Sequence, residues 1–400
     1  MKYGVIFFNE TANIGDDIQT YAALKLLPKV DYIIEREMLS SFVPKKNELV
    51  TTIMNGWYVH DVTSLPPSPF INPLVISAHF TDHLLQEKPE YFDEYFLNFM
   101  RKVQPIGLRD DLVKKYLDDA GIENYFSGCL TLTIKSFKNV KKLDRICAVD
   151  VDGEILSKIK KTAKCEVIEE THTLNPALNS LLSFDERMKN VEEKLKKYQA
   201  SKLVITSRLH VALPCLSIGV PVLLIYNDSD IDISNRLGKY TGLLNFVSKK
   251  QFMRKPEYDI VNKKDHLKIR KNLLKIVDEF LESSKNKKLS STEDSTCYSK
   301  YFSEQKRYIN DMIKHKNGKY EKRIAEYEKA YNKLFMINEF NIKESEIRRQ
   351  NLAMARLEVS ELKQQLSNIT SSRGYKLIEF LRRIIRKIKN IIKKILRLGR

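Results

Sequence analysis

Residues 203–226 read LVITSRLHVALPCLSIGVPVLLIY, and this stretch decides the fold class. The apolar run at 203–206 predicts a buried strand, Ser207 is placed to cap a helix, and that helix is expected to end at Gly219. A second apolar run at 220–226 predicts the next strand. Strand, helix and strand joined by such short connections form a βαβ unit, which is typical of a parallel sheet.

The segments on either side of this unit alternate in the same way. Expected strands cover residues 3–8, 74–77, 103–107 and 146–150, and expected helices cover 17–27, 89–101, 110–120, 185–198 and 266–283, with Gly121 at the C-terminal cap of the third. The basic run 135–142 predicts a linker between two lobes, residues 1–134 and 143–284. The predicted fold class is therefore α/β, with two Rossmann-like lobes in a GT-B-like arrangement.

The last third of the chain has a different character. Every proline lies at or before Pro256, and residues 285–299 have the Lys, Ser and Thr content of a linker. An apolar heptad then predicts a helical or coiled-coil region over residues 300–372, although polar members between its two halves weaken the seam. The heptad also makes a homo-oligomer a candidate partner.

The C-terminal residues 373–400 predict a basic amphipathic helix. Eleven Lys or Arg stand there against the single Glu379, which gives +10 of the total net charge of +18. Ile and Leu recur along one face of this helix, so it is expected to lie on an anionic membrane surface. The alternatives are a helix packed on the lobes or an oligomer seam. Nucleic acid is not expected as a partner, because a broad aliphatic stripe suits lipid better than bases.

The remaining composition excludes several classes of protein. Five cysteines without a C-x-x-C pair fit reduced thiols in the cytoplasm. The N-terminal apolar run is too short for a secretory signal, and Pro214, Gly219 and Pro221 interrupt the longest uncharged stretch, so neither export nor a membrane-spanning helix is expected. The Rossmann and Walker phosphate-loop patterns are absent. No metal or other cofactor is expected, since the two D-x-D patterns, Asp150 with Asp152 and Asp228 with Asp230, are short enough to arise by chance.

The strongest candidate site is Ser207-Arg208-Leu209-His210, at the carboxyl end of a strand and the start of a helix. A helix N-terminus favours an anion, and Arg208 adds a bidentate donor for carboxylate or phosphate. His210 adds a group that exchanges protons near neutral pH. The structural alternative is a surface arginine beside a core histidine.

Three weaker candidates come from the first lobe. Arg109 follows a strand and is a possible second anion clamp, with Asp110 as a helix cap. Residues 13–17 (NIGDD) join a strand to a helix, and they predict either contacts to sugar hydroxyls or a helix start with Asp16 and Asp17 in its first turn. His60 and His79 are the other candidates, and a buried structural histidine is the alternative for His79.

Six blocks, taken in order, resemble the polysaccharide pyruvyl transferase family: NIGDDIQTYA, NGWYVHD, PPSPFINPLVISAHF, PIGLRD, YFSGCLTLT and ITSRLHVALPCLSIGVPVLLI. The resemblance covers about residues 1–245, and the long helical C-terminus departs from it. It implies a GT-B-like enzyme that transfers the enolpyruvyl unit of phosphoenolpyruvate to a sugar as a pyruvate ketal. It implies that Arg109, Arg208, Leu209 and His210 hold phosphoenolpyruvate, and it extends to His79. The chemistry of the transfer then makes His210 the expected proton donor, with His79 as a second catalytic residue. Ser207, Asn13, Gly15 and Asp16 are expected as further substrate contacts because of their positions beside strand ends.

The expected function is therefore pyruvyl transfer to a cell-surface polysaccharide or its lipid-linked precursor. Phosphoenolpyruvate and a glycan acceptor are the expected partners. The expected location is the cytoplasm, at the inner face of the cell membrane. Two alternatives remain: a nucleotide-sugar glycosyltransferase on the same scaffold, and a non-catalytic membrane-associated scaffold.

Overall fold

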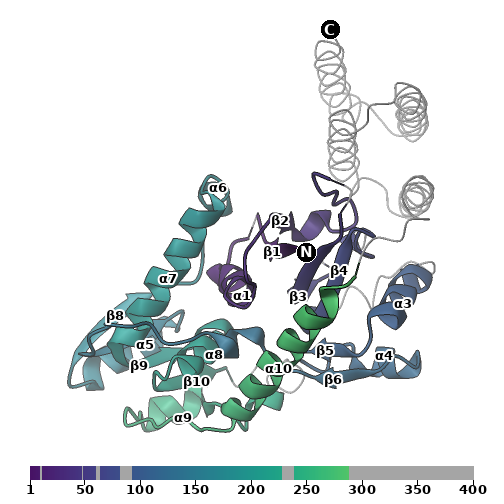
Figure 1. Ribbon diagram of the computed structural model, residues 1–400. Helices are drawn as coiled ribbons and strands as arrows, with labels where there is room; N and C mark the ends of the chain where they lie inside the picture. Colours follow the sequence, from purple (N-terminus) through teal and green to yellow (C-terminus); the bar gives the residue numbers. More distant parts are fainter. Residues whose placement is uncertain (10, 47, 60–63, 82–91, 228–237, 288–400) are drawn as a thin grey trace, which may run out of the picture. The chain divides into compact units, whose positions relative to one another are not determined.

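The computed structural model describes residues 1–287, apart from residues 10, 47, 60–63, 82–91 and 228–237. The predicted coiled-coil region and C-terminal helix lie outside the described residues, as do His60 and the Asp228–Asp230 pattern. Within the described part, two parallel sheets carry the fold (Figure 1). The predicted α/β class with two separate sheets is confirmed.

The first sheet has the strand order β2-β1-β3-β4-β5-β6, and its strands run parallel to one another. Its strands are β1 (Lys2–Phe7), β2 (Tyr32–Glu35), β3 (Val50–Tyr58), β4 (Ile71–Phe80), β5 (Ile106–Leu108) and β6 (Asn124–Phe126). The helices that accompany it are α1 (Ile14–Leu24), α3 (Phe92–Val103) and α4 (Lys114–Asp119), followed by the 3-10 turn η3 (Leu130–Thr133).

The second sheet has the order β11-β10-β9-β7-β8 and is also parallel. Its strands are β7 (Leu143–Val149), β8 (Glu166–Glu170), β9 (Ser201–Thr206), β10 (Val222–Tyr226) and β11 (Asn245–Ser248). Its helices are α5 (Gly153–Thr162), α6 (Pro176–Asn179), α7 (Phe184–Ala200), α8 (Leu209–Ser217), α9 (Lys249–Arg254) and α10 (His266–Ser284). The unit β9-α8-β10 is the βαβ unit that the opening stretch predicts.

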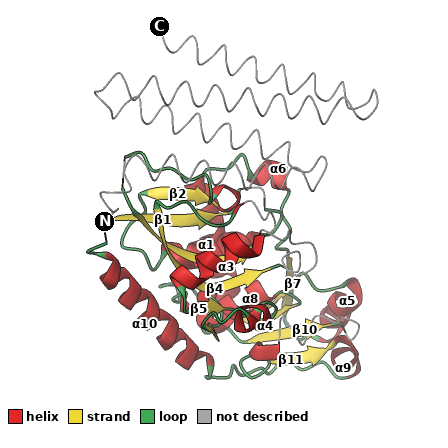
Figure 2. Ribbon diagram, turned by 90° about the vertical axis from the view of Figure 1, so that its right-hand side faces the viewer, coloured by secondary structure: helices red, strands yellow, loops and turns green. Residues whose placement is uncertain are grey.

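Alternating burial shows why both sheets are covered on two faces. In β7, Cys147 and Val149 pack into a central cluster, whereas Ile146 and Ala148 pack into a separate cluster with α5 and α9. Side chains alternate in this way because a strand has a period of two residues. The apolar strands of a parallel sheet need such cover on both sides, and helices supply it in each sheet (Figure 2).

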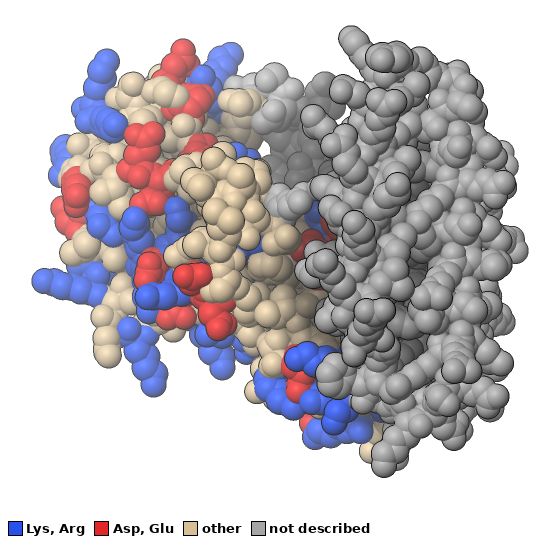
Figure 3. All heavy atoms as spheres, turned by 90° about the horizontal axis from the view of Figure 1, so that it is seen from above, with Lys and Arg blue, Asp and Glu red and all other residues tan. Residues whose placement is uncertain are grey.

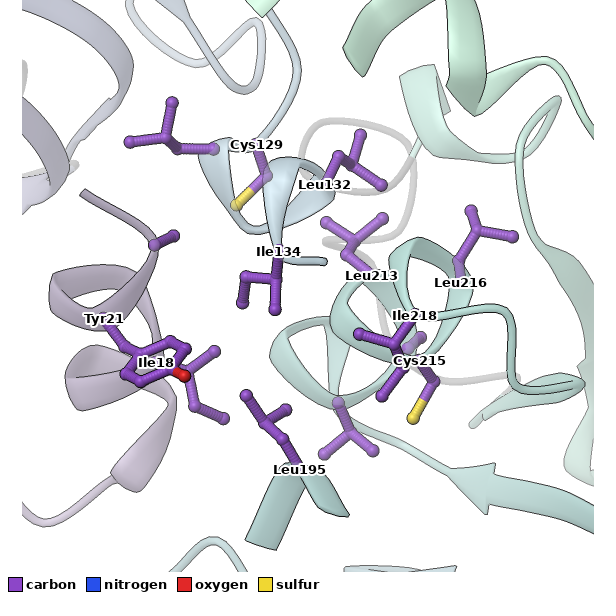
Figure 4. Packing of buried hydrophobic residues seen from close by; sticks show 14 of the residues in the cluster. Ile18, Tyr21, Cys129, Leu132, Ile134, Leu195, Leu213, Cys215, Leu216 and Ile218 are labelled. Carbon is purple, nitrogen blue, oxygen red and sulfur yellow. The ribbon is translucent and has the colours of Figure 1, made fainter. Parts of the chain in front are cut away.

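One hydrophobic cluster is shared by the two sheets. It joins Ile18 and Tyr21 of α1 to Leu195 of α7, to residues of η3 and to the apolar side of α8 (Figure 4). The same cluster includes strand residues of both sheets. The lobes are therefore packed through a common core and not only joined by the linker at residues 135–142.

Polar contacts reinforce this junction. Ile14 N donates to the carbonyl of His172 at 3.0 Å, and Leu174 N donates to the carbonyl of Ala12 at 2.7 Å. Helix α10 starts beside the second sheet and returns to the first, where Asn72 Nδ2 donates to Ser284 Oγ at 2.8 Å (Figure 1). The helix predicted at residues 266–283 thus ties the two lobes together.

Several local predictions need correction. Ser207 does not cap α8: Arg208 is the N-cap residue, without a side-chain cap, and Ser207 Oγ donates to the carbonyl of Asp150. Asp110 does not cap a helix either, because α4 begins only at Lys114 and Asp110 pairs with His79. Val103 ends helix α3 and does not begin a strand. In contrast, Gly121 has the positive φ of 67° expected of a residue that ends a helix.

Candidate functional site

The site lies where the carboxyl ends of strands from both sheets meet. Arg109 directly follows β5, His79 lies at the end of β4, and His210 lies in the first turn of α8, just after β9. Parallel sheets bind ligands at this edge, because all their strands end there and the connecting loops carry the functional side chains. The junction of the two lobes brings residues more than one hundred positions apart into contact.

Arg109 is the centre of the site. Its side chain is buried, and its Nη1 atom donates to Oε1 of Gln19 and lies 3.4 Å from Nε2 of His210. The hydroxyl of Tyr240 donates to the backbone carbonyl of Arg109 at 2.9 Å. A cation from the first lobe therefore faces a proton-exchanging group from the second, as expected of a site that binds an anion and transfers a proton.

His79 and Asp110 form a buried pair beside Arg109. Nδ1 of His79 lies 2.6 Å from Oδ2 of Asp110, and Arg109 Nε lies 3.8 Å from the same oxygen. Burial alone would raise the pKa of Asp110, but the hydrogen bond from His79 and the charges of His79 and Arg109 outweigh it and hold the pKa below its usual range. Asp110 is thus ionised and fixes the orientation of the His79 ring.

A bulge in β4 decides which way His79 points. Met54 pairs with Val75 and Gly56 with Ala78, so β4 contains one more residue than β3 over this stretch. Ser77 takes up the extra residue with a left-handed φ of 54°, and its N–H donates to Ser127 Oγ. One inserted residue moves every later side chain to the opposite face of the strand. The strained Ser77 therefore sets the face on which His79 lies.

Arg208 is the exposed member of the site. Its side chain is 48% exposed, and Nε donates to Oδ2 of Asp150 at 3.1 Å. Burial would raise the pKa of Asp150, but bonds from Thr171 and from the N–H of His172, together with the charge of Arg208, lower it. Asp150 is thus an ionised anchor for Arg208, while Asp152 caps α5 by accepting from Ile155 N.

In the described part of the chain no group of His, Cys, Asp and Glu could hold a metal ion.

The loop before α1 packs directly on His210. Asn13 caps α1 by accepting from Gly15 N at 2.9 Å, as a helix start requires. A Cβ atom on Gly15 would lie 3.1 Å from Cβ of His210, so glycine permits this close approach. Both carboxylates of the loop are buried. Asp16 accepts from Thr11, Gln19 and Trp57, and Asp17 pairs with Arg187, so their oxygens are engaged within the protein.

Sequence reasoning did not single out Gln19, Trp57, His172 and Arg187. Each has common structural roles, and its contact partner here is distant in sequence. Gln19 contacts Arg109, and Arg187 contacts Asp17 across 170 positions. The only sequence signal for them was the adjacent pair Asp16 and Asp17 in the NIGDD loop, and this pair does not reveal which residues it contacts.

His172 gives the junction between the lobes a dependence on pH. Burial, together with the smaller effect of the nearby charge of Lys194, lowers its pKa to about 3. Nε2 lies 2.8 Å from the hydroxyl of Tyr198, whereas Nδ1 is buried without a hydrogen-bond partner among the described residues. The folded protein therefore holds His172 neutral under conditions in which an unfolded histidine is protonated.

We expect acidification to destabilise the fold through His172. As the pH falls below the unfolded pKa of about 6.5, His172 binds a proton in the unfolded chain but not in the folded one. The free energy of unfolding therefore falls by about 1.4 kcal/mol per pH unit. Between pH 7.5 and 5.0 this contribution amounts to about 2 kcal/mol. Urea unfolding of wild type and His172→Gln at both pH values isolates it. The free energy of unfolding of wild type relative to that of His172→Gln should be lower at pH 5.0 than at pH 7.5 by about that amount. A relative free energy that does not change with pH would contradict the prediction.

Comparison with known proteins gives one family match. The family model described as polysaccharide pyruvyl transferase matches residues 13–229, more than half of the chain. Among solved structures, an uncharacterized protein from Klebsiella pneumoniae is similar at 11% identity and a TM-score of 0.37, over 62% of this chain and 92% of that one. The UDP-GlcNAc 2-epimerase of Methanocaldococcus jannaschii, with UDP-GlcNAc and UDP bound, is similar at 12% identity and a TM-score of 0.36, over 70% and 100%. No curated protein matches.

Proposed function

The chain belongs to the polysaccharide pyruvyl transferase family and is a transferase, and on this basis we propose that it moves the enolpyruvyl unit of phosphoenolpyruvate to a sugar. The acceptor is a cell-surface polysaccharide or its lipid-linked precursor, and the product is a pyruvate ketal. The observation that carries the proposal is the meeting of Arg109 and His210 between the two lobes, with Nη1 3.4 Å from Nε2.

Phosphoenolpyruvate suits this arrangement chemically. It carries a carboxylate and a phosphate on the same carbon, and guanidinium groups bind both in a bidentate manner. Arg109 supplies one cation from the first lobe. Arg208 supplies another from the second lobe, where the start of α8 adds the positive end of a helix dipole. Since half of the Arg208 side chain is exposed, it can exchange Asp150 for an incoming anion.

The transfer forms two C–O bonds to the sugar and breaks the C–O bond to the phosphate. A proton is added to the methylene carbon of phosphoenolpyruvate, which leaves positive charge on the neighbouring carbon. Two sugar hydroxyl oxygens then bond to that carbon and lose their protons, while phosphate leaves. His210 is the proposed proton donor, and Arg109 and Arg208 hold the carboxylate and phosphate. His79 with ionised Asp110 is positioned to take up the proton of one hydroxyl, and the other hydroxyl proton returns to His210. No metal or other cofactor enters this scheme.

Calorimetry with phosphoenolpyruvate tests the donor assignment. Wild type is expected to bind it saturably, and Arg208→Ala is expected to weaken binding by about 10- to 150-fold, because a charged hydrogen bond contributes about 1.5–3 kcal/mol. Arg145→Ala is a matched control, since Arg145 lies at the start of β7 and its Nη2 contacts the carbonyl of Lys197. If wild type instead binds only a nucleotide sugar, the glycosyltransferase alternative is correct. If it binds neither, the scaffold alternative gains support.

We further propose that residues 373–400 hold the enzyme on an anionic membrane at the inner face of the cell membrane, near lipid-linked acceptors. The support is their net charge of +10 and their aliphatic stripe. No helix in the described residues is long and apolar enough to cross a membrane. On the face drawn in Figure 3, basic and acidic side chains of the described part are interspersed, so that face offers no continuous basic surface to anionic lipid.

Flotation with liposomes tests the role of the tail. The full chain is expected to float with vesicles that contain anionic phosphatidylglycerol, while a chain ending at Ser372 remains at the bottom. Zwitterionic vesicles serve as the control, since each basic residue near an anionic surface contributes about 1 kcal/mol. Equal flotation of the two chains would assign membrane binding to another part of the protein.

A further inference from the structure

We propose that Gln19 is a positioning residue of this site: its side-chain amide holds the guanidinium of Arg109 so that one N–H faces Nε2 of His210. The kinetic consequence rests on the proposed pyruvyl transfer, whereas the structural consequence does not. No catalytic or binding role follows from the family resemblance for Gln19, which would not touch the substrate.

Gln19 occupies a buried position between the side chains of Arg109 and Asp16, which it connects. It lies on α1, and its side chain is 1% exposed. Oε1 accepts from Nη1 of Arg109, while Nε2 donates to Oδ1 of Asp16 at 3.3 Å. The backbone carbonyl of Gln19 accepts from Asn55 Nδ2 at 2.9 Å, which fixes this part of the helix against β3. Both ends of the amide are therefore hydrogen-bonded, and the side chain has little rotational freedom.

The orientation of this amide is determined by chemistry at both ends. Arg109 can only donate hydrogen bonds, so it must face the amide oxygen. At the other end, the indole N–H of Trp57 can also only donate, and it reaches Oδ1 of Asp16 at 3.2 Å. Thr11 Oγ1 donates to the other oxygen of Asp16 at 2.5 Å. Oδ1 of Asp16 accepts from Trp57, and the amide nitrogen of Gln19 faces the same oxygen.

This chain of contacts assigns the proton on His210. A guanidinium has no acceptor atom, so a hydrogen bond between Arg109 Nη1 and His210 Nε2 requires Nε2 to be the acceptor. The imidazole proton is then on Nδ1, and His210 is neutral before the donor binds. To act as the acid, His210 must first take up a proton on Nε2 from solvent or from the phosphate group, and it can do so only after the anionic groups of phosphoenolpyruvate have drawn Arg109 away from it. Proton delivery is thereby coupled to occupation of the site.

Removal of the amide should release this constraint. In Gln19→Leu, the Nη1 group of Arg109 loses its acceptor in a buried position and is free to turn away from His210 towards Asp110. His210 would then be found in both neutral tautomers. Gln19→Glu keeps an oxygen towards Arg109, and the new carboxyl group can share a proton with Asp16. We expect Gln19→Glu to restore the arrangement in part.

Nitrogen NMR of histidine imidazoles in the full chain tests the structural consequence without any substrate. With ¹⁵N-histidine labelling, the His210 signals are those absent from His210→Gln. Wild type is expected to show His210 protonated on Nδ1, and Gln19→Leu a mixture of tautomers. Thr20→Val is the matched control, because it removes a buried bond from the same helix, Thr20 Oγ1 to the carbonyl of Ile6, outside this network. An unchanged tautomer in folded Gln19→Leu overturns the proposal.

Kinetics provides the second measurement. We expect Gln19→Leu to lower kcat by about ten- to a hundredfold with a smaller change in KM for phosphoenolpyruvate, since a misplacement of about 1 Å costs up to about a hundredfold. Gln19→Glu should recover part of that loss, and Thr20→Val should match wild type. Equal losses in Gln19→Leu and Thr20→Val would reduce Gln19 to a packing role. If wild type transfers no pyruvyl group, the proposed function fails, while the NMR result still decides the positioning of Arg109.

Discussion

His210→Ala is expected to lower kcat by about two to four orders of magnitude while phosphoenolpyruvate still binds. The side chain lies between the lobes, with Nε2 3.4 Å from Arg109, where it can exchange a proton with a donor held by the two arginines. Its loss leaves Arg109 and Arg208 in place to hold the anion. Steady-state rates of phosphate release, together with calorimetric binding of phosphoenolpyruvate, measure the two effects separately.

His266→Gln is the matched control for this variant. His266 is buried at the start of α10, and its Nδ1 lies 3.0 Å from the carbonyl of Lys263. Its replacement should leave kcat near that of wild type. Undiminished turnover in His210→Ala would remove His210 from the mechanism, and loss of binding without loss of kcat would assign it to donor recognition instead.

Arg187→Met is expected to lower the free energy of unfolding by about 3–5 kcal/mol. Arg187 on α7 is completely buried, and it pairs with both oxygens of Asp17 on α1. It also donates to the carbonyls of Phe8 and Asn9, at 2.7 Å and 3.1 Å. Burial raises the pKa of Asp17 to about 6 even beside Arg187, so the carboxylate depends on this partner. Urea unfolding at pH 7.5 measures the loss.

Two comparisons separate the buried charge from ordinary packing. Lys196→Met breaks an exposed pair with Glu192 on the same helix and should cost no more than about 0.5 kcal/mol. Adding Asp17→Leu to Arg187→Met removes the stranded carboxylate and should recover part of the stability, although two backbone carbonyls remain unpaired. A loss in Arg187→Met as small as that in Lys196→Met would show that the pair does not hold the lobes together.

The sequence predicts those parts of the fold whose information is local. The stretch 203–226 predicts β9, α8 and β10, because apolar strands, a helix and Gly219 follow one another within a few residues. Strands such as β2 and β3 were not predicted. In β3, Thr51, Thr52 and Asn55 are polar yet buried, because their neighbours in the sheet and in α1 satisfy them. Periodicity cannot recognise a polar residue whose partner lies elsewhere in the chain.

The sequence likewise predicts the main residues of the candidate site but not the contacts that position them. From the residues and the resemblance together, Arg109, Arg208 and His210 were identified, since each stands directly after a strand end. Their support was not predicted. The bulge at Ser77 that aims His79, and the pairing of Asp110 with His79 instead of a helix start, depend on strand register. Register is set by contacts between whole strands, and a linear pattern does not contain it.

The sequence by itself therefore determined the α/β class, the two groups of parallel strands and the candidate site residues at their ends. Local propensity and side-chain chemistry are sufficient for these features. Only the tertiary structure decided that Arg109 of one lobe meets His210 of the other, that Gln19 orients Arg109, and that Arg187 neutralises Asp17 across the junction. Such contacts join residues about 90 to 170 positions apart, and they follow from the packing of α1, α7 and α8 around one core.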